Sequence, residues 1–464
     1  MKTTIGSAIT VENPSAEVQQ WCRENLIISN PEYHKAVAMG KWTGSIPRSF
    51  QLYVKDANKL VIPFGCLCDI WRLLSGCPYK LEFSPIKPFD YRSHINLYDY
   101  QEDALKSILE GKNGVAVMPC GSGKTQTALE AIARIGGKAL WLTHTQDLLN
   151  QSLNRAKTVL GADTSSYGTI TGGKVNIGAG ITFATVQTMA KLNLAEYKNA
   201  WDVVVVDECH KAIGTPTKIM QFYSVLTQLS CRYKIGLTAT PYRADKLERC
   251  MFALLGGILC EIPKSSVKST TCPVKVKFYR TGYFPECEAV LAGDGTINYA
   301  ALVDDLTHNS QRFECVSNVL KALDGPAIVL ANRVEYLERL EKSTQKRSVC
   351  LSSMGTSKAA KEVRKEALRK LNNGELDCIF ATYQLAKEGL DVPNLRYVVF
   401  ATPEKDKTTV MQSAGRVERK AEGKEFGTVI DFVDDFGMFR GWQKKRKGFY
   451  KKLGYEIDEY DALW

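Results

Sequence analysis

The chain has 464 residues, too many for a single hydrophobic core, which indicates two to three domains. Its 44% hydrophobic and 24% charged residues are ordinary for a globular protein, and the absence of a long apolar run or a signal-peptide pattern excludes a membrane-spanning chain and favours a cytosolic one. The net charge of +11 favours a polyanionic partner, although a basic excess also serves solubility.

Residues 1–90 differ in pattern from the rest of the chain. Phe50–Val54 and Lys59–Pro63 flank a polar turn and predict a hairpin, while Leu67–Leu74 predicts a short helix that ends at a Ser-Gly pair. A proline-rich stretch over residues 78–88 then indicates a linker. We therefore predict a small α+β accessory domain over residues 1–90.

The cysteines are scattered and form no C-x-x-C pair, although the chain contains 14 of them. Cys66, Cys68 and Cys77 make the only cluster. Reduced and mostly buried thiols are the main interpretation of these three residues, and a zinc site is the alternative.

Met118–Thr125 reads Met-Pro-Cys-Gly-Ser-Gly-Lys-Thr, between a predicted buried strand at Gly114–Met118 and a predicted helix at Gln126–Ile135. Such a glycine-rich turn aims backbone N–H groups at phosphate oxygens, and its Lys and Thr supply a positive charge and a hydroxyl for Mg²⁺. The strict pattern has glycine where this chain has Met118. The alternative, a fortuitous Gly-Ser-Gly turn, is disfavoured by the strand-loop-helix context.

A run of β-branched residues, Val203–Val206, predicts a strand buried on both faces of a parallel sheet. It delivers Asp207 and Glu208 to the carboxyl end of the sheet, where α/β proteins bind their ligands. Asp207 is suited to hold Mg²⁺ through water, and Glu208 to orient and deprotonate the water that attacks the γ-phosphate. Taken alone, two adjacent acids at the end of a strand would be interpreted as solvated residues that cap the strand.

Apolar strands alternate with helical patterns in two series, which predicts two parallel sheets covered on both faces. The first series, within residues 91–262, has strands at 114–118, 139–143, 181–184, 203–206 and 235–237. The second series, within residues 263–464, has strands at 327–330, 378–380, 397–401 and 428–432, with helices at 334–342 and 357–372. Only the first half contains the phosphate-binding loop.

Gln412–Arg419 reads Gln-Ser-Ala-Gly-Arg-Val-Glu-Arg, and with it the series of motifs between Leu97 and Asp431 resembles the superfamily 2 helicases. Within them, Pro119–Thr125, Asp207–His210 and Gly236–Pro241 followed by Arg243 resemble the branch of XPB and UvsW. The resemblance implies two tandem RecA-like domains, at 91–262 and 263–464, that enclose ATP. It also makes residues 1–90 a candidate DNA-recognition domain.

The resemblance assigns roles to residues of both domains. Thr238–Thr240 is similar to the motif that couples hydrolysis to movement, and His210 is expected to link Asp207 and Glu208 to Thr238 and Gln412. The expected catalytic residues are Lys124, Asp207, Glu208, His210, Gln412, Arg416 and Arg419. The expected ATP-binding residues are Tyr100, Gln101, Pro119, Cys120, Gly121, Ser122, Gly123, Lys124, Thr125, Gly389 and Asp391. Thr125 and Asp207 are expected at Mg²⁺, and the expected nucleic-acid contacts are Thr143, His144, Thr185, Gln187, Thr188 and Thr382.

Hydroxyls of threonines at strand ends suit phosphate contacts that carry no sequence information, although each of them singly is an ordinary strand residue. Thr182 belongs to the same group of hydroxyls. Past the second domain, residues 439–452 interleave basic and aromatic side chains. They predict either a helix that follows a phosphate backbone or a solvated helix whose aromatics pack on the domain.

The sequence therefore predicts an ATP- and Mg²⁺-dependent DNA helicase or translocase that moves 3′ to 5′ and remodels forks and junctions in recombination, repair or replication. A monomer is the expected state. An RNA-dependent ATPase is one alternative, because the catalytic motifs do not decide the sugar. A nucleic-acid-binding switch and a duplex translocase without strand separation are the others.

Overall fold

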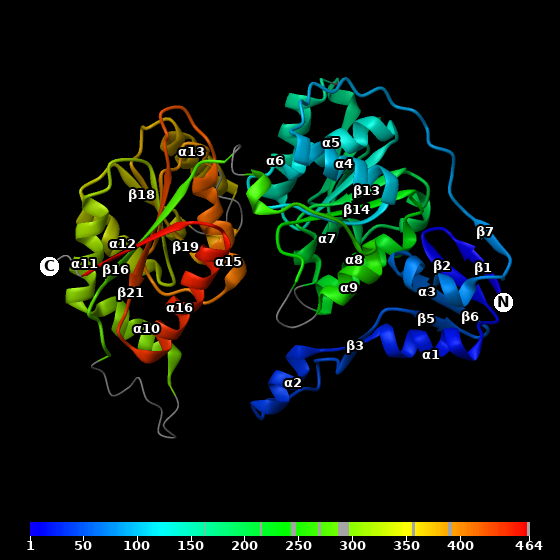
Figure 1. Cartoon of the computed structure of the whole chain (residues 1–464), viewed down its shortest axis with the longest axis horizontal. Helices are drawn as coiled ribbons and strands as arrows, with labels where there is room; N and C mark the ends of the chain where they lie inside the picture. Colours follow the sequence, from blue (N-terminus) through cyan, green and yellow to red (C-terminus); the bar gives the residue numbers. More distant parts are fainter. Residues whose placement is uncertain are drawn as a thin grey trace. The chain divides into compact units, whose positions relative to one another are not determined.

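A computed structural model of the chain describes residues 1–161, 163–213, 216–242, 247–267, 271–285, 297–354, 358–387 and 392–461. The chain forms two compact units, Met1–Pro263 and Lys264–Trp464, which are drawn in Figure 1. Within the described residues, no helix is long and apolar enough to cross a membrane.

The first unit begins with a small sheet of mixed strand direction, in the order β5-β6-β2-β1-β7 within the described part of the chain. Helices α1 and α3 belong to the same domain. Strands β3 and β4 pair with each other and are not part of this sheet. The bounds are β1 (Lys2–Ile5), β2 (Ala8–Glu12), α1 (Ala16–Asn25), β3 (Ile27–Ser29), α2 (Pro31–Ala38), β4 (Ser49–Gln51), β5 (Val54–Asp56), β6 (Lys59–Pro63), α3 (Leu67–Leu74) and β7 (Tyr79–Leu81). This is the predicted α+β N-terminal domain.

The second strand of the predicted hairpin is confirmed, and the prediction of its first strand is wrong. β6 pairs with Val54–Asp56, whereas Phe50 lies in β4 and pairs with Ile28 of β3. Phe50 is buried, and the alternation of buried side chains does not specify which strand becomes the neighbour. The predicted helix at Leu67–Leu74 is confirmed.

The rest of the first unit is built on a larger sheet, whose described strands follow the order β11-β10-β12-β9-β13-β14-β8-β15. All pairings in it are parallel except β10 with β11. The bounds are α4 (Asp99–Gly111), β8 (Asn113–Val117), α5 (Lys124–Ile135), β9 (Ala139–Thr143), α6 (Gln146–Val159), β10 (Tyr167–Thr171), β11 (Lys174–Asn176), β12 (Ile181–Thr185), α7 (Val186–Met189), β13 (Val203–Val206), α8 (Pro216–Gln228), β14 (Tyr233–Thr238), α9 (Glu248–Leu255) and β15 (Ile258–Glu261).

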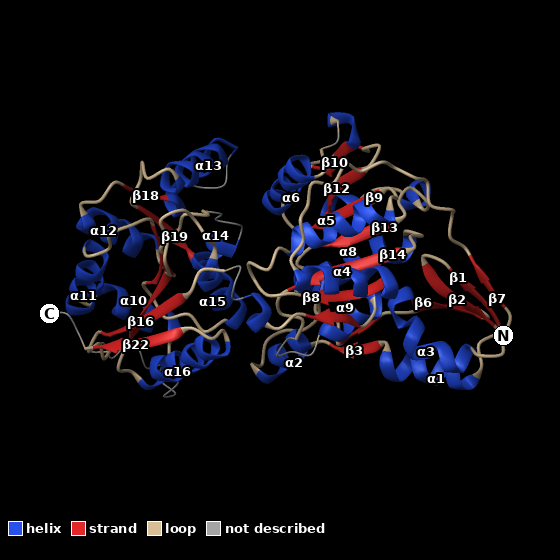
Figure 2. Ribbon diagram, turned by 45° about the horizontal axis from the view of Figure 1, so that its top comes forward, coloured by secondary structure: helices blue, strands red, loops and turns tan. Residues whose placement is uncertain are grey.

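Helices cover both faces of this sheet, as Figure 2 shows. The side chains of β13 alternate accordingly: Val203 and Val205 join the core under α4, α5 and α6, while Val204 and Val206 join the core on the opposite face. The prediction of a strand buried on both faces is confirmed, because all four valines are fully buried.

The second unit contains another sheet, with its described strands in the order β18-β19-β17-β20-β21-β16-β22 and every pairing parallel. The bounds are β16 (Val274–Arg280), α10 (Tyr299–His308), α11 (Ser310–Lys321), β17 (Ala327–Ala331), α12 (Val334–Thr344), β18 (Ser348–Cys350), α13 (Lys358–Asn372), β19 (Cys378–Thr382), α14 (Tyr383–Lys387), β20 (Tyr397–Phe400), α15 (Lys407–Ala414), β21 (Gly427–Val433), α16 (Gly437–Lys452) and β22 (Glu456–Tyr460). Two parallel-sheet RecA-like domains preceded by an α+β domain are thus the fold, as predicted.

Close backbone packing joins the N-terminal domain to the larger sheet of the first unit. A Cβ on Gly65 would lie 2.5 Å from both Gly256 N and Phe252 O, so the turn before α3 sits directly on α9. Nearby, the wholly buried Lys234 of β14 donates to Ser7 O and Leu226 O at 2.8 Å. The N-terminal domain is therefore an integral part of the first unit.

Gly65→Ala is expected to lower the melting temperature of the protein by several degrees. The added methyl group meets backbone atoms that cannot rotate away, and overpacking of this kind costs about 1–3 kcal/mol. Thermal unfolding measures the effect. Gly441→Ala is the matched control, since a Cβ there meets no atom within 4 Å, and it should be neutral or stabilising. Equal melting temperatures of the two variants would contradict the close approach.

Candidate functional site

The glycine-rich loop lies between the carboxyl end of β8 and the start of α5, as the sequence predicts. Gly121 and Gly123 have φ of 76° and 78°, a left-handed conformation that glycine adopts at little cost. Lys124 Nζ lies 3.4 Å from Met118 O and 3.3 Å from Pro119 O, so its ammonium group is folded back over the loop. Met118 is fully buried and donates its N–H to Thr238 O, which shows why an apolar residue fits there.

Tyr100 and Gln101 of α4 contact the loop through its backbone. The Tyr100 hydroxyl and Gln101 Nε2 donate to Ser122 O at 3.2 and 2.7 Å, and Gln101 Oε1 accepts from Tyr98 N. A Cβ on Gly123 would lie 2.3 Å from Gln101 Nε2. These residues therefore shape the loop, and the reading of adenine by the same pair stays a prediction.

Asp207 and Glu208 follow β13 at the same edge of the sheet. Asp207 Oδ1 accepts from Glu208 N at 3.0 Å, and Ser152 Oγ of α6 donates to Asp207 Oδ2 at 3.4 Å. Glu208 has a φ of 48°, which is uncommon for a residue with a side chain and costs conformational energy. Strain of this kind persists where the surrounding structure holds a functional group in place.

The two carboxyl groups have displaced pKa values. Burial and, to a smaller extent, the charge of Glu208 raise the pKa of Asp207 to about 6, although the positive charge of Lys124 opposes both effects. Burial also acts to raise the pKa of Glu208, but the positive charges of Lys124 and His210 outweigh it and hold the pKa below its ordinary value. Glu208 therefore stays ionised beside the loop.

His210 connects the acids to the end of β14. Its Nδ1 lies 3.3 Å from Glu208 Oε2 and 2.9 Å from Thr238 Oγ1, and Thr238 Oγ1 also accepts from Thr240 N at 3.0 Å. The structure thus brings together three of the predicted motifs on the adjacent strands β8, β14 and β13. Gln412 belongs to the second unit, and its part in this linkage stays a prediction.

The candidate nucleic-acid residues of the first unit gather at the carboxyl ends of β9 and β12, which pair through Thr143 and Thr185. Gln187 Nε2 donates to His144 O at 3.0 Å, and the Thr185 and Thr188 hydroxyls lie 3.0 Å apart. β9 adjoins β13, so the cluster lies at the same edge of the sheet as Asp207 and Glu208, while β13 and β14 separate it from β8 and the phosphate-binding loop.

Two of the predicted hydroxyls are buried and form hydrogen bonds within the protein. Thr143 is fully buried and its hydroxyl donates to Thr145 O at 3.0 Å, while Thr182 lies fully buried inside β12 and accepts from Gly178 N. Their hydroxyls form hydrogen bonds with nearby backbone groups, because buried polar groups in proteins are almost always hydrogen-bonded. In the second unit, Thr382 ends β19 and its N–H donates to Ser352 Oγ at 2.6 Å.

The two predicted arginines of the second unit differ in their surroundings. Arg416 Nη2 donates to Ala386 O at 2.6 Å and is half-buried, whereas Arg419 is exposed at the end of the short 3₁₀ helix Gly415–Glu418. Gln412 is half-buried on α15. Gly389 and Asp391, with the neighbouring Glu388, lie outside the described residues, as does Arg243.

A buried cluster anchors the backbone that carries these arginines, and no sequence pattern pointed to it. Glu418 is almost fully buried, forms an ion pair with Lys264 and accepts from the Tyr455 hydroxyl at 2.7 Å. Lys424 Nζ donates to Val417 O and Arg419 O at 2.8 Å. Its burial lowers its pKa to about 8.

Glu418→Gln is expected to lower the free energy of unfolding by roughly 1–3 kcal/mol, because it leaves the half-buried Lys264 ammonium without its carboxylate. Denaturant unfolding of the second unit measures the loss. The control is Glu366→Gln, whose ion pair with Arg369 is exposed and contributes little. A Glu418→Gln protein as stable as the control variant would show that the cluster does not hold the segment.

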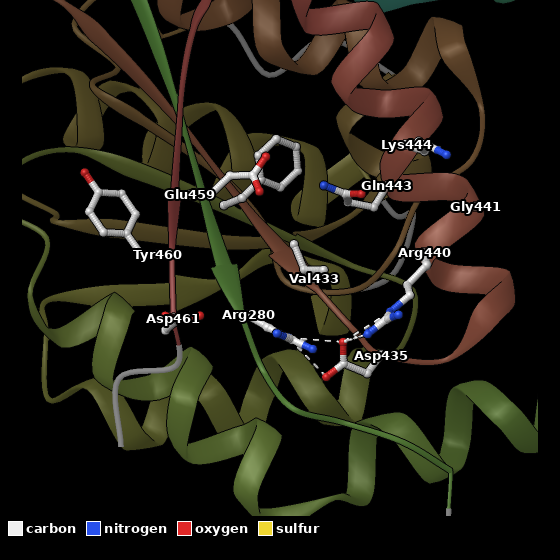
Figure 3. Close-up of a pocket in the computed structure, with 11 residues that line it drawn as sticks. Arg280, Val433, Asp435, Arg440, Gly441, Gln443, Lys444, Glu459, Tyr460 and Asp461 are labelled. Atoms are coloured by element: carbon white, nitrogen blue, oxygen red, sulfur yellow. Dashed lines mark hydrogen bonds and ion pairs between the residues drawn. The ribbon is translucent and has the colours of Figure 1, made fainter.

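Helix α16 resolves the alternatives for residues 439–452. Tyr450 and Phe439 are buried and Trp442 and Phe449 pack against the core, so the aromatics dock on the second unit as the second alternative predicts. Arg446 is buried with Asp431, at 2.7 Å. Beside α16 lies a hollow of about 620 Å³, shown in Figure 3, where Asp435 accepts from both Arg280 and Arg440.

Cys66, Cys68 and Cys77 are free thiols as in their main interpretation, but the prediction that they are mostly buried holds only for Cys66. Cys66 is buried, and burial raises its pKa, while Cys68 is exposed and Cys77 is half-buried. Within the described part of the chain, no group of three His, Cys, Asp or Glu side chains is arranged to hold a metal ion.

Comparison with known proteins gives two family matches and several relatives. Residues 94–243 match the family described as "Type III restriction enzyme, res subunit", and residues 311–421 match "Helicase conserved C-terminal domain". Together they cover more than half of the chain and include strands of both parallel sheets.

Three relatives are similar over most of the chain. The "Putative ATP-dependent RNA helicase L396" of Acanthamoeba polyphaga mimivirus is 26% identical over 89% of this chain and 78% of its own length. The "DNA 3'-5' translocase XPB2" of Sulfurisphaera tokodaii is 27% identical over 71% and 80%. The "ATP-dependent DNA helicase uvsW" of Enterobacteria phage T4 is 24% identical over 86% and 83%.

The ordered motifs, the paired parallel sheets and these matches agree with one another. The chain belongs to the superfamily 2 helicases, ATP-dependent enzymes with two RecA-like domains, and it is similar to XPB and UvsW proteins of that superfamily.

Proposed function

We propose that this helicase acts on DNA, moves 3′ to 5′ along one strand and remodels forks and junctions. The observation that carries the proposal is the arrangement at one edge of the first unit's sheet. The phosphate-binding loop follows β8 and the acids follow β13, and the hydroxyl and amide cluster of Thr185, Gln187 and Thr188 lies at the ends of β9 and β12, with β9 next to β13. Two relatives with DNA in their names support the choice of substrate.

Within the first unit, we assign Lys124 to the β- and γ-phosphates and Glu208 to the attacking water. Backbone N–H groups of residues 119–125 would hold the phosphate oxygens. His210 and Thr238 would orient Glu208, since both contact points are already formed. Glu208 is ionised and rigidly held, as a residue that orients and accepts a proton from water must be.

Mg²⁺ fits the donors at this site. Asp207 is buried and Glu208 is half-buried next to it in the chain, and burial raises the pKa of Asp207, so an additional cation would stabilise the charged pair. Carboxylate and hydroxyl oxygens, here of Asp207 and Thr125, are the ligands that Mg²⁺ prefers. When bound, Mg²⁺ would neutralise charge on the phosphates.

Within the second unit, we assign Arg419 to the γ-phosphate of the nucleotide and Arg416 to holding the segment that carries it. The exposed position of Arg419 and the hydrogen bond from Arg416 to Ala386 O support this division. Gln412 is proposed to complete the nucleotide site with them.

The test uses matched substrates and scores ATP hydrolysis and strand displacement together. Duplexes with a 3′ tail, duplexes with a 5′ tail, forks, four-way junctions and the same strands as RNA form the panel. The proposal expects unwinding of 3′-tailed duplexes and higher activity on forks and junctions than on plain single strands. Equal activity on plain strands would remove branch remodelling from the proposal and leave the motor.

RNA is the second candidate substrate, because the mimiviral relative is named an RNA helicase. Stronger stimulation by RNA than by matched DNA in the same panel would favour it. Hydrolysis without strand displacement would instead indicate a duplex translocase or an ATP-driven switch.

A further inference from the structure

We propose that residues 27–51 of the first unit form an arm that binds a nucleic-acid strand by stacking a base on Trp42. The inference rests on the proposed action on nucleic acid and adds a second contact in the N-terminal domain. The arm consists of β3, α2, the loop 39–48 and β4, and Figure 1 shows α2 set apart from α1 and α3.

Strand pairing and hydrogen bonds hold the arm together. β3 pairs with β4 in an antiparallel pair that is not part of the five-stranded sheet. At its tip the buried Asn30 donates from its backbone N to Arg48 O and from Nδ2 to Pro47 O, at 3.0 and 2.7 Å. Asn30 Oδ1 also caps α2 by accepting from Glu32 N. The loop 39–48 is thereby fastened to the start of the helix.

Trp42 is the most exposed large apolar side chain that the structure describes, with 79% of its surface accessible. A Cβ on Gly44 would lie 2.2 Å from Trp42 Cζ2, so one side of the indole lies against the glycine backbone and the rest of it is open. Val37 and Met39, beside it along the chain, are more than half exposed. Nothing in the fold requires these apolar groups to face water.

The charge of the arm selects a polyanion. Lys35, Lys41 and Arg48 are all exposed, and Glu32 is the only carboxylate of residues 27–51. An open indole among exposed cations is the combination that binds single strands, because the cations follow the phosphates while a base stacks on the ring. Stacking accepts any base and either sugar, so the arm itself is expected to bind DNA and RNA strands alike.

The experiment measures binding of oligothymidylate and oligouridylate strands by the full chain, with Trp42→Ala, Trp42→Phe and the control Trp71→Ala. Trp71 is a partly exposed tryptophan of the same domain, but its ring contacts Tyr79. Trp42→Ala should weaken binding roughly ten-fold, since one stacked base contributes about that much affinity. Trp42→Phe should restore part of the loss, and Trp71→Ala should bind like the parent chain.

A second measurement reports stacking itself. Binding of oligothymidylate should quench tryptophan fluorescence, and the quenching should be largely lost in Trp42→Phe and kept in Trp71→Ala. The paired change Lys41→Ala and Arg48→Ala should weaken binding and reduce its dependence on salt concentration. Melting curves confirm that each variant is folded.

Unchanged affinity and unchanged quenching in Trp42→Ala and Trp42→Phe would overturn the proposed role of the arm in strand binding, even where the parent chain shows strand-stimulated ATP hydrolysis. A parent chain that neither binds strands nor responds to them would instead overturn the proposed function. Loss of binding to a protein ligand but not to strands in Trp42→Ala would identify the arm as a protein-docking surface and also contradict the proposal.

Discussion

Arg419→Ala is expected to lower nucleic-acid-stimulated ATP hydrolysis by roughly 10³–10⁵-fold while sparing the binding of nucleic acid. The proposed role of Arg419 is to stabilise the charge that develops on the transferred phosphoryl group, and an arginine in this role is worth that much in rate. Arg419 is exposed at the end of its 3₁₀ helix, so its loss removes little packing. A coupled ATPase assay at saturating DNA and a binding assay give the two readouts.

Arg369→Ala is the matched control, because Arg369 is an exposed arginine of the same unit that pairs only with neighbouring acids on the surface, Glu366 and Glu375. Its hydrolysis rate should equal that of the parent chain. A rate for Arg419→Ala within a few-fold of the control would remove Arg419 from the nucleotide site. Arg416→Ala should also lower the rate, and it should additionally lower stability through the lost contact with Ala386.

Glu208→Gln is expected to lower ATP hydrolysis by roughly 10²–10⁴-fold and to leave ATP binding near its original strength. Glutamine has the shape of glutamate but lacks the basic oxygen that accepts a proton from the attacking water. The side chain at this position is held by a strained backbone and by the neighbouring His210, so the replacement should keep its place. Hydrolysis is followed by phosphate release, and binding by titration with a fluorescent ATP analogue.

Glu110→Gln serves as the control for this change, since Glu110 is an exposed residue of α4 with a weak surface ion pair. It should hydrolyse ATP at the parent rate. Hydrolysis by Glu208→Gln at a similar rate would contradict the assignment of Glu208. A variant that failed to bind ATP would point instead to a distorted loop.

Much of the framework was predictable because it is local. The strands at 139–143 and 203–206 and the helix at 67–74 have the bounds that their apolar patterns indicated. Each is a short uninterrupted pattern with clear breakers at its ends, so neighbouring residues carry the signal. The edge strands β11, β18 and β22 were missed because they are only three to five residues long, and β11 and β22 also expose most of their side chains.

The site residues also divide into those that a local sequence pattern reveals and those that it does not. The loop, the acids and the arginine segment are contiguous motifs whose spacing is visible in the sequence. Ser152 and Glu418 act through contacts with residues far from them in the chain, and their own surroundings in sequence are unremarkable. Thr143 and Thr182 were predicted as strand-end hydroxyls, yet their burial assigns their hydrogen bonds to neighbouring turns.

By itself, the sequence determined the family, the fold of both parallel-sheet domains and the residue types that meet ATP, because a strand followed by a loop and a helix presents its functional groups at a known end of the sheet. Tertiary structure alone decided which strands are neighbours, and hence that Asp207, Glu208, His210 and Thr238 gather beside the phosphate-binding loop. It also decided that Glu418 is buried and that Trp42 is exposed. Burial depends on packing between segments that are distant in the chain, which no local pattern encodes.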